Sequence, residues 1–313
     1  MPRRAWIAFA TVSVLWGLPY LFIKVAVDEV SPAAVVFARA ALGAALLAPL
    51  AMRTGALAGL RARWRSILVL AALDMAGPFL LISAGQRHIP SSLAGILVAS
   101  VPLLVAVLAL WVDHSERVRG VRLVGLFVGF AGVVMLLGVE VSASGPALVG
   151  ALLVLGASLS YAAATLFYKR ELTDASPLGV VTVSLSLSAA MLAVPAALTA
   201  PAQVPSAGAL ASLVVLGVFC TALAFWVFYR LVGDVGAGKA AVITYVAPAV
   251  SVLAGVLVLG EALTAGAVAG LLLILAGSYL STGGRLPPRL PALARRRAPA
   301  RPPAEPELAA PAP

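Results

Sequence analysis

The sequence has 313 residues, of which 62% are hydrophobic and 11% are charged, and its formal net charge is +10. Soluble domains carry about 25% charged residues, so this composition argues against a soluble protein and indicates a chain embedded in a lipid bilayer. A strongly basic chain can also indicate nucleic-acid binding, but the distribution of the basic residues, described below, argues against that class. Cys220 is the only cysteine, which excludes an internal disulfide.

Ten apolar segments follow one another along the chain, each about long enough to cross a hydrocarbon core of roughly 30 Å. Clusters of Pro, Gly, Ser or charged residues separate them. The segments are 6–27, 32–52, 66–86, 92–112, 120–140, 147–168, 177–199, 207–230, 238–259 and 263–282. The loops between them are short, the longest being 53–65, so no sizeable soluble domain is expected. We therefore predict an all-α integral membrane protein with ten transmembrane helices.

A sequence pattern in Val98–Gly132 recurs in Thr244–Gly277. Glu116 in the first stretch and Glu261 in the second are each followed by Gly-Leu after nine residues and by Ala-Gly after fifteen. The separation of about 145 residues is too long for the period of a solenoid. The pattern indicates a duplicated half-protein.

The duplication predicts three regions. A first five-helix repeat covers 1–140 and a second covers 141–282, while 283–313 is rich in Pro, Ala and Arg and is predicted to be a disordered basic cytoplasmic tail. Because five spans is an odd number, the second repeat enters the membrane from the opposite face. Inverted-topology repeats are typical of secondary transporters, which bind substrate near the midplane between the repeats.

The basic residues lie mainly on one side of this ten-span arrangement. If the N-terminus is cytoplasmic, nineteen of them are cytoplasmic and only Arg87 is external, with Lys24 near a helix end and Arg39 inside the second span. This is the positive-inside pattern, and it places both termini in the cytoplasm. The charge therefore records topology and contact with anionic membrane lipid, with no nucleic-acid partner expected. The nineteen are Arg3, Arg4, Arg53, Arg61, Arg63, Arg65, Arg117, Arg119, Arg122, Lys169, Arg170, Arg230, Lys239 and six arginines of the tail.

Several short motifs occur in a fixed order across both halves. They are Trp16-Gly17 followed by Lys24, Gly217-Val-Phe-Cys-Thr221-Ala-Leu-Ala-Phe225, and Pro248 followed by Leu259-Gly260-Glu261, Gly270 and Ala276-Gly277. Their order and spacing resemble the drug/metabolite transporter superfamily, specifically its EamA-type ten-helix members, over roughly residues 6–282. The first repeat departs from the family at Glu116, which follows Asp-His-Ser where Leu-Gly is usual. The resemblance implies an inner-membrane carrier, most often an exporter of amino acids or other small metabolites.

Motifs for enzymatic chemistry are missing from the sequence. It contains no nucleotide-binding loop of the form G-x-x-x-x-G-K-[ST] and no H-E-x-x-H metal motif. The two histidines, His88 and His114, lie near loops that the ten-span model places on opposite faces of the membrane. We therefore expect neither an enzyme nor a bound cofactor or metal.

Polar and aromatic side chains recur at helical spacing on several spans, so that they share a face. A polar face is unfavourable in lipid and should line the bundle interior or a wet cavity. The alternative is helix packing, in which hydroxyl groups bond to their own helical turn. The predicted substrate-binding residues are Trp16, Tyr20, Tyr161, Thr165, Thr221, Phe225, Tyr229, Thr244 and Tyr245. The aromatic members would suit an apolar or cationic group.

Three charged residues lie within or at the end of a predicted span. A buried charge in a membrane marks a functional or a paired site, so Lys24, Arg39 and Asp74 are candidates for coupling or substrate contact. Asp74 could take up and release a proton during transport. The alternatives are a structural Arg39–Asp74 pair and a pair between Lys24 and Asp28, one helical turn away.

Pro102 and Pro248 occupy corresponding positions in the fourth and ninth spans. Each removes one backbone hydrogen bond from its helix. Interrupted helices at a repeat interface recur in transporters as binding or gating elements, which makes both prolines candidate gating residues. The alternative is a fixed kink that improves packing.

These observations favour a secondary active transporter of the inner membrane. We expect it to export small metabolites, such as amino acids or amphipathic compounds, by alternating access between two inverted repeats. Two alternatives remain open, a flippase for a lipid-linked metabolite and a membrane partner or sensor that transports nothing. The sequence is compatible with a homodimer as well as with a monomer.

Overall fold

The computed structural model describes residues 3–112, 120–140 and 145–281. Glu116, His114 and the predicted tail 283–313 lie outside these described residues. All regular secondary structure of the described residues is helical, with no strand, as predicted for an all-α protein.

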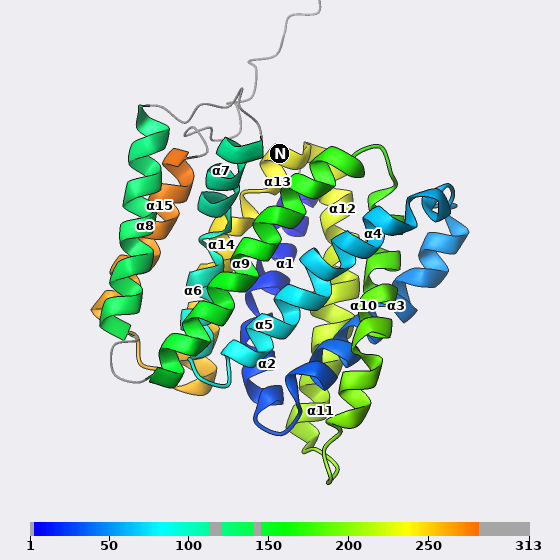
Figure 1. The fold of residues 1–313 in the computed structure, drawn as a ribbon, viewed down its shortest axis with the longest axis horizontal. Helices are drawn as coiled ribbons and strands as arrows, with labels where there is room; N and C mark the ends of the chain where they lie inside the picture. The colour runs from blue at the N-terminus through cyan, green and yellow to red at the C-terminus, as the bar shows by residue number, and fades with distance from the viewer. Residues whose placement is uncertain (1–2, 113–119, 141–144, 282–313) are drawn as a thin grey trace, which may run out of the picture.

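The helices follow one another in an up-and-down order (Figure 1). They are α1 (Arg3–Gly17), α2 (Pro19–Val27), α3 (Pro32–Arg53), η1 (Leu60–Arg63), α4 (Trp64–Leu70), η2 (Ala71–Ala76), α5 (Gly77–Gly85), α6 (Ser91–Val98), α7 (Val101–Val112), α8 (Val121–Glu140), α9 (Gly145–Glu171), α10 (Pro177–Leu198), α11 (Ala207–Val214), η3 (Val215–Leu223), α12 (Ala224–Val235), α13 (Ala237–Ala240), α14 (Ile243–Leu259) and α15 (Ala265–Ser281).

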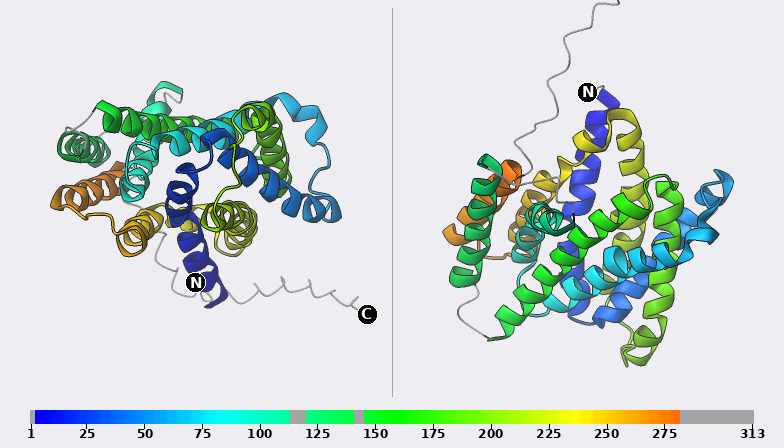
Figure 2. Two further views of the ribbon diagram at one scale, coloured as in Figure 1. Left: turned by 90° about the horizontal axis from the view of Figure 1, so that it is seen from below. Right: turned by 45° about the horizontal axis from the view of Figure 1, so that its top comes forward.

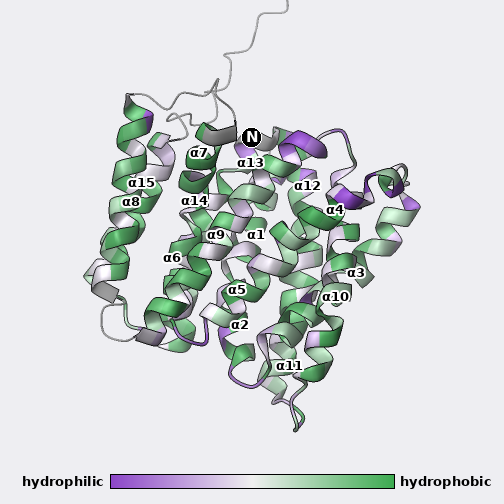
Figure 3. Cartoon of the chain, in the orientation of Figure 1, coloured by the Kyte–Doolittle hydropathy of each residue, from purple (hydrophilic) through white to green (hydrophobic). Residues whose placement is uncertain are grey.

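Several of these helices join into longer stretches. In the described part of the chain, eight helical stretches are long and apolar enough to cross a membrane, and α14 and α15 are two shorter apolar helices. Hydrophobic residues cover the lengths of the helices, and hydrophilic residues gather towards their ends (Figure 3). The membrane class of the fold is therefore confirmed, whereas the count of ten spans stays a prediction.

The two ends of the bundle carry different turns. The N-terminal end holds the start of α1, the end of α15 and α13 (Figure 1). The opposite end, here called the far end, holds the turns 28–31, 86–90, 199–206 and 260–264.

Two spans contain a π-helical segment, in which the helix carries an extra residue per turn. In η2, Pro78 has no N–H to bond the carbonyl of Asp74, and Gly77 donates instead to the carbonyl of Ala72, five residues back. In η3, the hydroxyl of Thr221 donates to the carbonyl of Leu216 at 2.8 Å, also five residues back. These segments interrupt the third and eighth predicted spans at corresponding positions.

The two candidate gating prolines differ in their effect on the helix. The fourth predicted span breaks between α6 and α7, so that Pro102 is the second residue of α7. At this break the carbonyl of Leu97 accepts hydrogen bonds from Ser100 and Ser158, at 2.6 and 3.3 Å. Pro248, by contrast, lies inside the continuous helix α14.

Close contacts between helices join the first half of the chain to the second. A Cβ added to Gly17 of α1 would lie 2.5 Å from the Cβ of Val250 in α14, so only glycine fits there. The helices α8 and α15 approach equally closely, because Gly277 faces the backbone of Gly129. The α8–α15 pair lies at one edge of the bundle (Figure 2).

Candidate functional site

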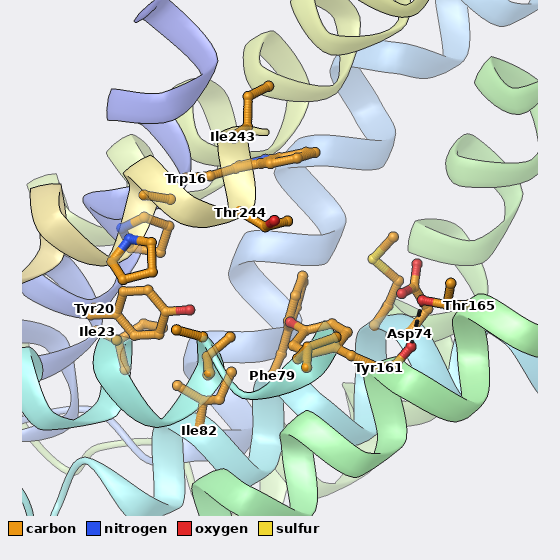
Figure 4. A pocket seen from close by; sticks show the side chains of 18 of the residues that line it. Trp16, Tyr20, Ile23, Asp74, Phe79, Ile82, Tyr161, Thr165, Ile243 and Thr244 are labelled. Atoms are coloured by element: carbon orange, nitrogen blue, oxygen red, sulfur yellow. Dashed lines mark hydrogen bonds between the residues drawn. The ribbon is translucent and has the colours of Figure 1, made fainter. Parts of the chain in front are cut away.

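A cavity of about 340 Å³ lies inside the bundle, between helices of both halves. Figure 4 shows Trp16 and Tyr20 on one side of it, Asp74 and Thr165 on the other, and Phe79 and Tyr161 between them. The wall is mostly apolar, with few polar groups, as is typical of small-molecule sites.

Most of the residues predicted from the sequence line this cavity. Of the nine predicted substrate-binding residues, six contribute to its wall, as do both prolines and two of the three charges. The wall residues are Trp16, Tyr20, Tyr161, Thr165, Phe225 and Thr244, with Arg39, Asp74, Pro102 and Pro248. Thr221, Tyr229, Tyr245 and Lys24 lie outside this wall.

An aromatic cluster forms one side of the cavity and continues behind it. The ring of Trp16 meets Phe225 edge-on, with centroids 5.6 Å apart, and packs against Phe228 at 4.7 Å. Tyr229 stacks on Phe225, with centroids 6.1 Å apart. Tyr229 and Phe228 lie outside the cavity wall and pack against the aromatic residues that form it.

Arg39 brings a positive charge to the cavity wall from α3. Its side chain is only 7% exposed, its Nε donates to the hydroxyl of Thr221 at 2.8 Å, and its guanidinium carbon lies 3.7 Å from the ring centroid of Phe79. Thr221 is fully buried and holds Arg39 without facing the cavity. Arg39 and Asp74 form no ion pair in the described structure, so the alternative of a structural pair between them is wrong in this conformation.

Asp74 lies in the π-helical segment η2, where it is half-buried and lines the cavity. Its carboxyl group makes neither a hydrogen bond nor an ion pair with the residues that the structure describes. A carboxyl group without a fixed partner can change its protonation state or bind a cationic group without first breaking another contact.

Lys24 has a structural contact at the far end. Its ammonium donates to the backbone carbonyl of Gln86 at 2.8 Å, and the Gln86 side chain donates in turn to the carbonyl of Tyr20 at 2.9 Å. These bonds tie α2 to the end of α5. The expected alternative, an ion pair of Lys24 with Asp28, is not formed in the described structure.

Glu261 joins the two halves at the far end. Its carboxylate accepts hydrogen bonds from the backbone N–H groups of Ser91 and Ser92, with N···O distances of 2.6 and 2.9 Å. These N–H groups begin α6, whose N-cap residue, Pro90, offers no capping side chain. Burial tends to raise the pKa of Glu261, but the hydrogen bonds from Ser92 and Ser91 outweigh it, so the pKa lies below its ordinary value.

A second contact at the far end involves Glu29 and the turn before α11. The backbone N–H and the hydroxyl of Ser206 both donate to the carboxylate of Glu29, each at 2.6 Å. These hydrogen bonds lower the pKa of Glu29. Sequence reasoning missed the partners of both glutamates, which lie more than 160 residues away along the chain.

Comparisons with known proteins match almost the whole described chain. A model of the EamA-like transporter family matches residues 3–138 and again 148–283. The chain is 29% identical to the "Uncharacterized transporter YvbV" of Bacillus subtilis, covering 87% of this chain and 89% of that protein. It is 28% identical to the "Uncharacterized inner membrane transporter YedA" of Escherichia coli K12, covering 82% and 83%. It is also 26% identical to a "Probable amino-acid metabolite efflux pump" of Salmonella typhimurium, covering 91% and 96%.

A solved crystal structure has the same fold. It superposes with a TM-score of 0.64 at 21% sequence identity, covering 89% of this chain and 96% of the other. At this identity the likeness concerns the fold alone.

Proposed function

The chain belongs to the EamA-like transporter family and is a multi-pass protein of the inner membrane, and we propose that it carries small metabolites through the cavity by alternating access. The observation that supports this proposal is the origin of the cavity wall. Trp16, Arg39 and Asp74 come from the first family match, and Tyr161 and Thr244 come from the second. A site between two repeats can open to either side when one repeat rocks against the other.

Alternating access requires one end of the cavity to close while the other opens. In this conformation the contacts of Lys24, Glu29 and Glu261 join helices at the far end. Thr165 and Thr244, by contrast, are exposed residues of the cavity wall. We assign the structure to a state that is closed at the far end, with ten spans and inverted repeats as its topology. Export of amino-acid-like or amphipathic compounds is the proposed direction and cargo class.

The proposed function is tested by a metabolite screen. Metabolites in the medium of cells that produce the protein are compared with those of cells that lack it, and each candidate is then loaded into proteoliposomes. We expect a small set of soluble compounds to leave loaded proteoliposomes faster than protein-free liposomes. If the cells differ in no soluble metabolite and no candidate moves, the proposal is wrong and a sensor or a lipid-linked substrate becomes the better interpretation.

The proposed topology predicts which loops a membrane-impermeant thiol reagent can reach. Gln203→Cys should react strongly from outside intact cells and Ala58→Cys should not, in a protein whose Cys220 has been replaced. Both positions are exposed in the structure, so a difference in labelling reports the side of the membrane and not burial. Labelling of Ala58→Cys together with protection of Gln203→Cys would contradict the ten-span topology.

A further inference from the structure

Arg39 is the one strongly buried charge among the described residues, and its partners are all uncharged. Thr221 takes the hydrogen bond from Nε, and Phe79 covers one face of the guanidinium. The two terminal nitrogens, Nη1 and Nη2, have no hydrogen-bond partner in the described structure. A buried cation without a counter-ion is unfavourable, so an anion that reaches the free nitrogens would be stabilised there.

Two contacts hold Arg39 in place beside the cavity. Thr221 is fully buried behind the guanidinium, and the π-helical bond of Thr221 to Leu216 fixes its hydroxyl as an acceptor for Nε. Phe79 holds the guanidinium plane from one face. Arg39 itself belongs to the cavity wall. The two free nitrogens can therefore donate a pair of parallel hydrogen bonds to the two oxygens of a carboxylate.

We propose that Arg39 is the anion-binding residue of the transport cavity, and that the cargo is a small organic carboxylate with an apolar body. The proposal rests on the transport function and names its substrate class. Thr221 and Phe79 act as positioning residues, because they orient the guanidinium and do not reach the cargo's charged group themselves. This assignment differs from the expectation of a cationic cargo held by aromatic rings alone. The apolar body packs against the aromatic wall at Trp16 and Phe225.

Three probes with the same phenylpropyl frame separate the charge of the cargo from its shape. They are 3-phenylpropanoate, which is anionic, its neutral amide, and the cationic 3-phenylpropylamine. Binding of each to the full-length protein in lipid nanodiscs is measured by titration calorimetry near neutral pH. We expect the carboxylate to bind at least about tenfold more tightly than either of the others.

Variants then locate the binding to Arg39. Arg39→Gln should abolish binding of the carboxylate, and Arg39→Lys should weaken it about tenfold, because lysine keeps the charge but loses the fork. Arg87→Gln is the matched control, since it removes the same charge from an exposed position outside the cavity and should leave binding unchanged. Thr221→Val should weaken binding of the carboxylate several-fold more than binding of the amide. A merely structural defect would weaken both to the same extent.

The proposal is overturned if the amine or the amide binds as tightly as the carboxylate, or if the carboxylate fails to bind at millimolar concentration. It is also overturned if the Arg39→Gln variant still binds the carboxylate. These outcomes are separable from failure of the transport function. Arg39-dependent binding of the carboxylate without flux in proteoliposomes would contradict transport and leave the anion site standing. Transport of a purely cationic metabolite would contradict the anion site and leave transport standing.

Discussion

Replacing Asp74 with Asn is expected to abolish accumulation of substrate driven by a pH gradient while leaving exchange of substrate between the two sides intact. Asn has the shape of a protonated Asp, so the variant is locked in the form that cannot release a proton. Asp74 lines the cavity and has no fixed partner in the described structure, which leaves it free to change its protonation state there. Uptake into proteoliposomes with and without an imposed pH gradient measures both activities.

Asp28→Asn is the matched control for this experiment. Asp28 is exposed in the turn at the far end, so its replacement removes a carboxylate without touching the cavity and should preserve accumulation. If Asp74 were structural, Asp74→Asn would reduce expression and Arg39→Gln would partly restore it, but the missing ion pair argues against this rescue. Unchanged gradient-driven accumulation in well-expressed Asp74→Asn would exclude Asp74 as the coupling residue.

Replacing Glu261 with Ala is expected to destabilise the protein by about 2 kcal/mol, because two backbone N–H groups at the start of α6 lose a charged acceptor. The carboxylate is half-buried, so this value is discounted from the full strength of two charged hydrogen bonds. Glu261→Gln keeps one acceptor oxygen and should fall between Ala and the wild type. Chemical unfolding of the purified protein in detergent measures the difference in free energy.

The contribution of Glu261 also depends on pH in a defined direction. Because the pKa of Glu261 is lower in the folded protein than its ordinary value of 4.5, the contribution is complete above that value and is lost as the pH falls through the folded pKa. Glu261→Gln should lack this loss. Glu171→Ala is the control, since it removes an exposed carboxylate whose ion pair with Arg170 contributes little. Equal stability of Glu261→Ala and Glu171→Ala would contradict the capping role.

The ten apolar segments predicted the all-helical membrane fold, and the order of the short motifs resembled the family to which the chain belongs. Helical spacing selected Trp16, Tyr161 and Phe225, because a polar or aromatic stripe on a membrane helix has few stable places other than the interior. The same spacing grouped Thr221, Phe225 and Tyr229 on one face, whereas in the structure Phe225 lines the cavity, Thr221 accepts a hydrogen bond from Arg39 and Tyr229 stacks on Phe225. The extra residue per turn in η3 can account for the direction of Thr221 alone, because Phe225 and Tyr229 both follow it in the regular helix α12.

Contacts between distant residues could not be predicted in the same way. The bond from Arg39 to Thr221 joins residues 182 apart, and the bond from Ser91 to Glu261 joins residues 170 apart. Periodicity identifies the face on which a residue lies, but the neighbouring helix depends on packing of the whole bundle. A signal for the Glu261 contact was nevertheless present, because α6 begins after a proline with no capping side chain.

If cargo crosses the membrane through the cavity, substrate flux in proteoliposomes should depend on the residues of the cavity wall, measured with variants at equal protein content. Trp16→Ala and Tyr161→Ala remove parts of the wall and Thr221→Val removes the support of Arg39, so all three should reduce flux severely. Ser186→Ala is the control, because Ser186 is exposed, lies outside the cavity and donates to the carbonyl of Thr182 in its own helix. We expect near-normal flux for Ser186→Ala alone; equal flux in all four variants would show that cargo does not pass through this cavity.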